Sequence, residues 1–168
     1  MTGDIGEITV SLVAPGWESA LPDAEALARR AAEAALAAAC PDIGPAGIAV
    51  VLADDRTLKD LNRDWRGKDA PTNVLSFPAS DIAEGARPET PEDGMPLELG
   101  DIILARETCL AEAAAQKKPL ADHVGHLVVH GVLHLVGYDH EAEAAAERME
   151  RLETRILASL GIPDPYAA

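Results

Sequence analysis

The chain has 168 residues, 48% of them hydrophobic, which suits one well-developed core and is short for two, so we expect a single domain over residues 1–168. Acidic residues outnumber basic ones by 29 to 14, and the net charge of −15 argues against broad, non-specific affinity for nucleic acid. The two cysteines, Cys40 and Cys109, form no disulfide framework and no C-x-x-C pair, and we expect both to be small buried residues.

Strands and helices alternate in the first half of the chain. Apolar residues alternate in Ile5–Val13, which predicts a strand. The elements expected next are a helix from Pro22 to Cys40, a short buried strand over Ile48–Leu52, a helix from Asp54 to Trp65 and a strand over Asn73–Phe77. In the helix from Asp54 to Trp65, apolar residues recur at helical spacing, which predicts one apolar face made of Leu58, Leu61 and Trp65.

The second half is mainly helical. Ala79–Pro96 is rich in proline, glycine and acidic residues, which predicts a long surface loop. The elements expected after it are a strand over Leu97–Leu104, a short helix over Arg106–Gln116, a helix begun by Pro119 and an amphipathic helix over Glu141–Leu160. This order predicts an α/β (α+β) fold, a small mixed sheet of about four strands covered by helices.

The sequence gives no sign of membrane association. Acidic residues precede Arg29, the first basic residue, which is unlike a secretory signal. The alanine-rich stretch 24–39 is interrupted by charged residues, and alanine is too weakly apolar for a membrane span. We therefore expect a soluble, cytoplasmic protein.

His130, His134 and His140, at spacings of four and six residues, predict a metal site. Residues four apart share one helix face, so His130 and His134 can bind one cation from a single helix. Gly137 suits a helix end in the left-handed conformation, after which the chain turns and brings in His140. Three neutral nitrogens leave a tetrahedral ion one position for water, as in a catalytic site.

The helix carrying these residues is predicted to be buried and central. At ~100° per residue, His123, His126, His130 and His134 fall in one stripe, and valines and leucines occupy the other faces. Buried imidazoles without partners are costly, and a metal supplies the partner. The sequence leaves open whether His126 supports the site, contacts substrate or only packs, and it favours packing for His123.

The spacing also matches the metzincin pattern H-E-x-x-H-x-x-G-x-x-H, with one exception. Gly131 occupies the position of the glutamate that serves as the general base of a peptidase. A conventional proteolytic mechanism therefore lacks its proton acceptor.

A basic segment stands out in this acidic chain. From Arg56 to Lys68 there are five basic residues against Asp60 and Asp64. The segment suits phosphate binding, and it equally suits a surface helix with internal ion pairs such as Asp60 with Arg63 or Asp64 with Lys68.

Three sequence blocks resemble the YbeY family of bacterial endoribonucleases. They are W-R-G-K-D-A-P-T-N-V-L-S-F-P at 65–78, L-G-D-I-I at 99–103 and H-G-V-L-H-L-V-G-Y-D-H at 130–140. The resemblance covers Ile48 to His140, in the family's order. Asn73 stands where many members have aspartate.

The resemblance implies a single-strand-specific, metal-dependent endoribonuclease that matures the 3′ end of small-subunit ribosomal RNA and acts in ribosome quality control. It implies one zinc ion on His130, His134 and His140, and a functional arginine at Arg66. It further implies a ribosomal RNA precursor as substrate, with ribosomal proteins and the GTPase Era as partners. The guanidinium of Arg66 suits two phosphate oxygens, although Arg66 could also stabilise the C-terminus of its own helix.

Several roles and two other functions stay open at this point. Asn73 and Ser76 could contact substrate or close a turn, and Asp139 could orient a histidine or serve as a turn residue. The general base, and the choice between water and the ribose 2′-hydroxyl as nucleophile, are not indicated. The alternatives are a zinc peptidase-like hydrolase, opposed by Gly131, and a non-catalytic ribosome-assembly factor with a structural metal.

Overall fold

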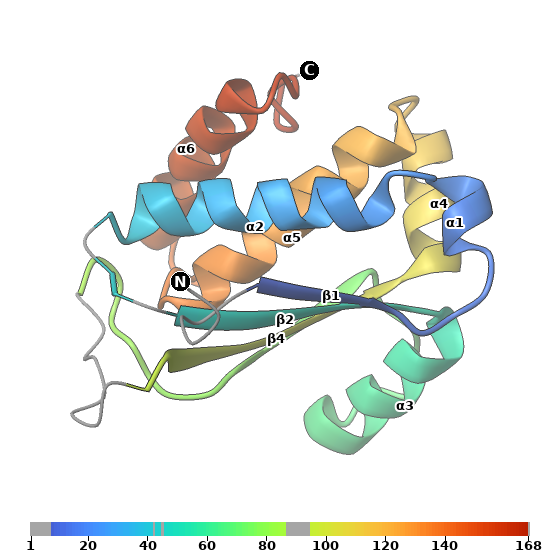
Figure 1. Ribbon diagram of the computed structural model, residues 1–168, viewed down its shortest axis with the longest axis horizontal. Helices are drawn as coiled ribbons and strands as arrows, with labels where there is room; N and C mark the ends of the chain where they lie inside the picture. Colours follow the sequence, from blue (N-terminus) through green and yellow to red (C-terminus); the bar gives the residue numbers. More distant parts are fainter. Residues whose placement is uncertain (1–7, 42, 45, 87–94, 168) are drawn as a thin grey trace.

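Four strands form one mixed sheet in the order β1-β2-β4-β3, in a computed structural model that describes residues 8–41, 43–44, 46–86 and 95–167. The strands are β1 (Ile8–Leu12), β2 (Ala46–Ala53), β3 (Val74–Pro78) and β4 (Leu97–Ala105). β1, β2 and β4 run parallel, and β3 pairs antiparallel with β4 at the edge. This confirms the predicted mixed sheet (Figure 1).

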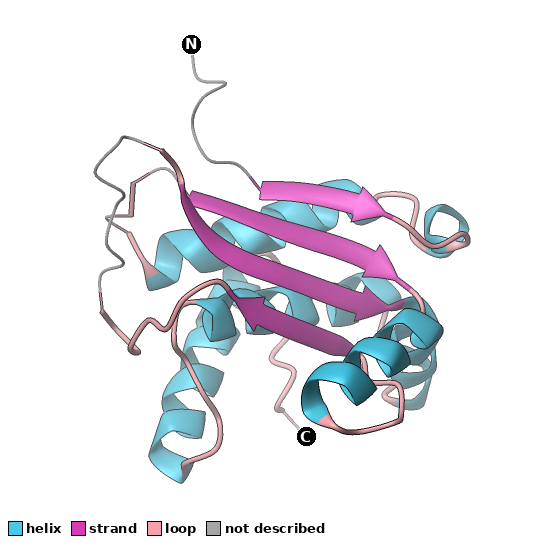
Figure 2. Ribbon diagram, turned by 90° about the horizontal axis from the view of Figure 1, so that it is seen from below, coloured by secondary structure: helices cyan, strands magenta, loops and turns pink. Residues whose placement is uncertain are grey.

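Six helices accompany the sheet in the described residues. They are α1 (Trp17–Ala20), α2 (Ala24–Ala39), α3 (Asp55–Arg66), α4 (Arg106–Ala115), α5 (Leu120–Leu135) and α6 (Glu143–Ser159). In Figure 1, α2, α5 and α6 lie on one side of the sheet and α3 on the other. Figure 2 shows the sheet from the side of α3, which covers one end of it.

Most predicted boundaries agree with the structure within two residues, and the start of the predicted first strand lies outside the described residues. The described parts of Ala79–Pro96 contain no helix or strand, as predicted. The sequence analysis missed α1. This single turn is held by Trp17, whose Nε1 donates a hydrogen bond to the carbonyl oxygen of Ala53 at 2.7 Å. One turn is too short to show periodicity, so a long-range contact determines it.

The main core lies between the sheet and the helices α2, α5 and α6. Its central helix is α5, on which ten residues are buried. Gly131 lets α5 approach β4 closely, since a Cβ there would lie 2.8 Å from Cγ2 of Ile102. Both cysteines are buried, as predicted. Within the described part of the chain, no helix has the length and apolar character needed to cross a membrane.

A second, smaller cluster lies under α3. Ala53, Leu58, Leu75 and Ala105 form it, with Leu61 and Phe77 packed against it. Asp54 begins α3 as predicted, because its carboxylate accepts a hydrogen bond from the backbone N–H of Thr57 at 2.9 Å. Trp65, at the other end of the helix, meets Phe77 of the same cluster, with ring centroids 6.1 Å apart, but it is 71% exposed, so the predicted apolar face is not buried as far as Trp65.

Candidate metal centre

The structure brings His130, His134 and His140 together. One ring nitrogen from each lies within 4.8 Å of the others, and Nε2 of His130 and Nε2 of His134 are 3.0 Å apart. His130 and His134 lie one turn apart on α5, and His140 comes from the segment that follows the helix. Among the described residues no fourth histidine, cysteine or acid joins this group.

The turn after α5 places His140. The backbone N–H of Tyr138 donates to the carbonyl of Leu133 at 2.9 Å, and that of Gly137 donates to the carbonyl of His134 at 3.1 Å. This pattern is a Schellman motif. Gly137 has φ +101°, and a Cβ there would lie 2.1 Å from the carbonyl oxygen of Ile82. The predicted left-handed glycine is therefore confirmed, and only glycine fits this turn.

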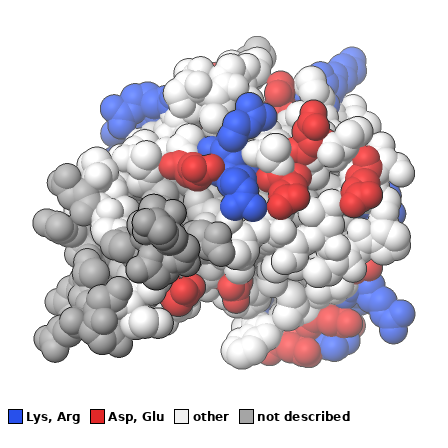
Figure 3. All heavy atoms as spheres, viewed as in Figure 1, with Lys and Arg blue, Asp and Glu red and all other residues white. Residues whose placement is uncertain are grey.

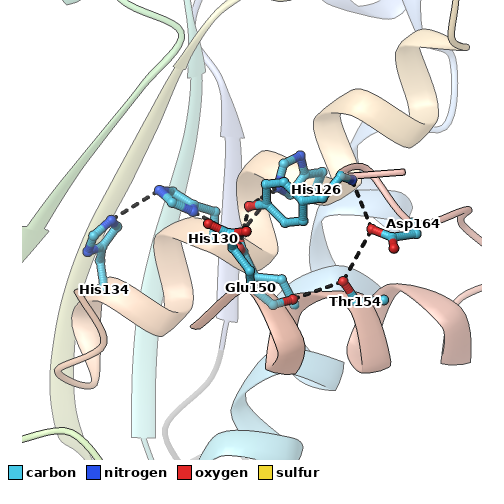
Figure 4. A network of polar contacts seen from close by, with 8 residues as sticks. His126, His130, His134, Glu150, Thr154 and Asp164 are labelled. Atoms are coloured by element: carbon cyan, nitrogen blue, oxygen red, sulfur yellow. Dashed lines mark hydrogen bonds and ion pairs between the residues drawn. The ribbon is translucent and has the colours of Figure 1, made fainter. Parts of the chain in front are cut away.

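Glu153 of α6 orients His130 within the group. Its Oε2 lies 2.8 Å from Nδ1 of His130, and its side chain is 0% exposed. A carboxylate accepts, so Nδ1 carries the proton and Nε2 presents its lone pair toward His134 and His140. Figure 4 shows this network running from His134 through His130 toward α6.

Two further groups hold Glu153. The hydroxyl of Tyr166 donates to its Oε1 at 2.5 Å, and Nε2 of His126 lies 3.4 Å from its Oε2. Burial alone would raise the pKa of Glu153, but hydrogen bonds from His126, His130 and Tyr166 outweigh it and lower the pKa to about 2. His126 therefore contacts the carboxylate that holds His130.

Glu153 was not predicted from the sequence as part of the site. The signal available was a glutamate among the buried positions of an amphipathic helix, beside Leu152 and Ile156. A fully buried glutamate requires partners, and these lie on α5 and near the end of the chain.

The donor set fits a divalent transition metal. Burial, followed by the proximity of His130 and His140, lowers the pKa of His134 to about 4. The ring is therefore neutral at pH 7, which is the form that binds a metal. Three imidazoles suit zinc and leave a coordination position open, although nickel, copper and iron also accept such ligands.

The three histidines line a cleft of about 720 Å³. The cleft also contains Trp65 and Arg66 from the end of α3, and Asn73, Ser76 and Asp139, which the sequence analysis had singled out. A hollow of similar volume, about 740 Å³, lies along α6 and contains none of the three histidines. The chemistry of the donor set therefore marks the first cleft as the candidate site.

Arg66 is the last residue of α3, and its ion pairing differs from that of the nearby Arg63. Arg63 forms ion pairs with Asp60 at 3.4 Å and Asp64 at 3.0 Å, which confirms part of the ion-paired surface helix. Arg66 has no salt bridge with any residue that the structure describes. Its guanidinium is therefore available to an anion in the cleft.

Asn73, His123 and Asp139 have hydrogen-bond partners outside the group of three histidines. Asn73 donates to Oε1 of Glu112 at 2.9 Å, and the same oxygen lies 2.8 Å from Nε2 of His123. The packing role expected for His123 agrees with its burial and with this bond. Asp139 accepts from the backbone N–H of Glu141 at 3.0 Å, as a turn residue does.

The fold and the site define a small α/β protein with a three-histidine candidate metal centre in an open cleft. The family profile described as Endoribonuclease YbeY matches residues 18–161. The chain belongs to the YbeY family of endoribonucleases.

Individual relatives agree over nearly the whole chain. Endoribonuclease YbeY of Paramagnetospirillum magneticum is 57% identical over 160 residues, covering 95% of both chains. The protein of the same name from Azorhizobium caulinodans is 52% identical over 163 residues, covering 96% of both. The solution structure of TM1509 from Thermotoga maritima shares the fold, with a TM-score of 0.51 at 20% identity over 96% of this chain and 99% of that chain.

Proposed function

We propose that the chain, acting as one domain in the cytoplasm, is a single-strand-specific endoribonuclease that matures the 3′ end of 16S ribosomal RNA and serves ribosome quality control. The observation that carries this proposal is the convergence of three imidazole nitrogens in an open cleft beside Arg66. Membership of an endoribonuclease family supports it. Contacts with ribosomal proteins and with the GTPase Era belong to the proposal on the resemblance alone.

His130, His134 and His140 would hold a zinc ion. Zinc bound there supplies a Lewis acid that polarises a phosphoryl oxygen and makes water nucleophilic near neutral pH. The protein's part is to keep the three rings neutral and oriented, through burial of His134 and through the bond from His130 to Glu153.

Arg66 would act as the electrostatic clamp. Its planar guanidinium can donate two parallel hydrogen bonds to phosphate oxygens. Charge on those oxygens rises as the phosphodiester approaches its transition state, so a cation at this place accelerates cleavage. The absence of a salt bridge with any described residue leaves the guanidinium free to do so.

The peptidase alternative loses support in the structure. A Cβ at Gly131 would point at Ile102 of β4, 2.8 Å from its Cγ2. A side chain at this position enters the core and not the cleft. A glutamate could not serve as general base from there.

Replacing Arg66 tests the clamp. We expect Arg66→Ala to reduce cleavage of an unpaired model RNA roughly 100- to 1000-fold, as loss of one transition-state donor does elsewhere. Bound metal, measured by elemental analysis, should stay the same. Arg63→Ala is the matched control, because Arg63 is already paired with Asp60 and Asp64. Unchanged cleavage by the metal-loaded Arg66→Ala protein would refute this role.

Replacing His134 separates a catalytic from a structural metal. We expect His134→Ala to stay folded by circular dichroism, to bind less metal and to lose RNA cleavage, because it removes one of three ligands. Casein, incubated in parallel with the wild type, should remain intact. An unfolded variant would instead support the non-catalytic assembly factor.

A further inference from the structure

Trp65 is exposed at the rim of the histidine cleft. Its side chain, 71% exposed, is the most exposed large apolar one among the described residues. It lines the same cleft as His130, His134 and His140. A single exposed apolar residue is common on protein surfaces, but this one lines the cleft that holds the three histidines, and an indole has a large flat face on which a planar ligand can stack.

The ring of Trp65 contacts Phe77 edge-on, so neither face of the indole is stacked on that neighbour. Its centroid lies 6.1 Å from that of Phe77 on β3, and the two planes meet at 66°. Phe77 packs against the small core cluster under α3, which gives the contact a fixed base. The indole is therefore positioned by one neighbour while most of its surface faces solvent.

Trp65 is followed directly by Arg66, which lines the cleft and has no salt bridge with a described residue. An aromatic face and a free guanidinium that line one cleft match a ligand that carries a planar ring and a phosphate. A nucleotide unit has both. In a duplex the faces of the bases are covered by their neighbours, so the ligand is an unpaired nucleotide.

We propose that Trp65 is a stacking platform for an unpaired base of the RNA strand whose phosphate binds Arg66. The inference rests on the proposed endoribonuclease function and adds a physical basis for its single-strand specificity. At a net charge of −15 the chain lacks broad attraction for phosphates, so an uncharged contact matters more here than in a basic protein. Stacking one base strengthens binding by roughly 5- to 150-fold.

Fluorescence reads this contact directly, because the chain has two tryptophans and Trp17 is 0% exposed. The metal-loaded protein is mixed in a stopped-flow instrument with a short unpaired oligoribonucleotide, its duplex, or an abasic strand of equal length. The unpaired strand should quench the emission of Trp65 on mixing, before cleavage, and the other two should quench it little. In Trp65→Phe the remaining emission of Trp17 should not respond.

Kinetics give the second measurement. Trp65→Leu should raise KM for an unpaired RNA roughly 5- to 150-fold with little change in kcat, whereas Trp65→Tyr, which still stacks, should retain most of the affinity. Val13→Ala, at another exposed apolar side chain, is the control and should leave KM unchanged.

Three results would overturn the proposal: quenching by the abasic strand as strong as by the unpaired one, no quenching by a strand that the protein cleaves, or an unchanged KM in Trp65→Leu. Failure of the wild type to cleave RNA would overturn the proposed function instead. Quenching is measured before cleavage, so the two failures are distinguishable.

Discussion

Glu153 determines how His130, one of the three candidate metal ligands, is oriented. Three groups donate to or contact its carboxylate, and His130 is the one that also faces the cation position. A hydrogen bond to the far nitrogen of a ligating imidazole fixes both its tautomer and its orientation. The buried carboxylate thus links α6 to the chemistry of α5.

Glu153→Gln tests this link. The amide keeps the size of the side chain but loses the charge that favours the proton on Nδ1 of His130, so we expect metal affinity to fall about 10- to 100-fold. Competition with a chelator measures the affinity. Glu147→Gln, on the exposed face of the same helix, is the matched control. Equal affinities in the two variants would show that the carboxylate only fills space.

At this scale the sequence predicted which histidines come together and missed the residue that supports them. His130, His134 and His140 are recognisable because helical spacing and a glycine turn bring near neighbours together. Glu153 lies 23 residues from His130 along the chain, so only the packing of α6 on α5 joins them. Trp65 shows the converse, since helical spacing predicted an apolar face and the ring meets Phe77 at the edge of that face while most of its surface is exposed.

α5 is the element that carries the site, and it lies close to β4. Gly131 faces the side chain of Ile102 on β4, and Gly125 faces the side chain of Ile162, which follows α6. A side chain at position 131 would displace the helix from the sheet. Because His130 and His134 move with the helix, the contact between Gly131 and Ile102 also determines where the candidate metal site lies relative to the sheet.

Gly131→Ala should destabilise the protein by up to about 2 kcal/mol. Adding a methyl group to a packed core costs about 1–3 kcal/mol, and the better helix propensity of alanine offsets ~1 kcal/mol of that. Gly125→Ala is the control. Its new methyl would meet Cδ1 of Ile162, the mobile end of a side chain, at 2.7 Å. Urea unfolding of both variants measures the difference, and equal stability would contradict the argument.

The elements themselves were largely predictable from the sequence. Alternation and helical periodicity identify segments with one apolar face, and these segments fill the core. The strand order was not predictable in the same way. β3 reaches the edge, beyond β4, by pairing antiparallel with a strand that follows it in the chain, and such pairing depends on how the whole sheet packs.

At the scale of the molecule, the face seen in Figure 3 has no broad basic surface. Lys and Arg side chains are interspersed there with Asp and Glu. The acidic excess keeps polyanions from binding widely. In the proposed function, RNA is therefore recognised in the cleft that Arg66 and Trp65 line together with the three histidines. The composition predicted the lack of broad affinity, and the structure places the candidate contacts in one cleft.

The stability of the whole molecule should decrease in mild acid because it buries neutral histidines. Burial lowers the pKa of His123 below its ordinary 6.5, and the nearby carboxylate of Glu112 offsets this only in part. As pH falls below 6.5 the unfolded chain takes up a proton that the folded chain does not, so the free energy of unfolding falls with pH. Above that pH the contribution is fully present.

His123→Gln isolates this effect, since His123 is not among the three candidate metal ligands. The amide can still donate to Glu112, so the variant should fold but should lose up to about 1.4 kcal/mol per pH unit of the wild-type slope below pH 6.5. Urea unfolding at a series of pH values measures both slopes. His134, with a pKa of about 4, contributes to both proteins alike, so parallel curves would mean that His123 is not held neutral by burial.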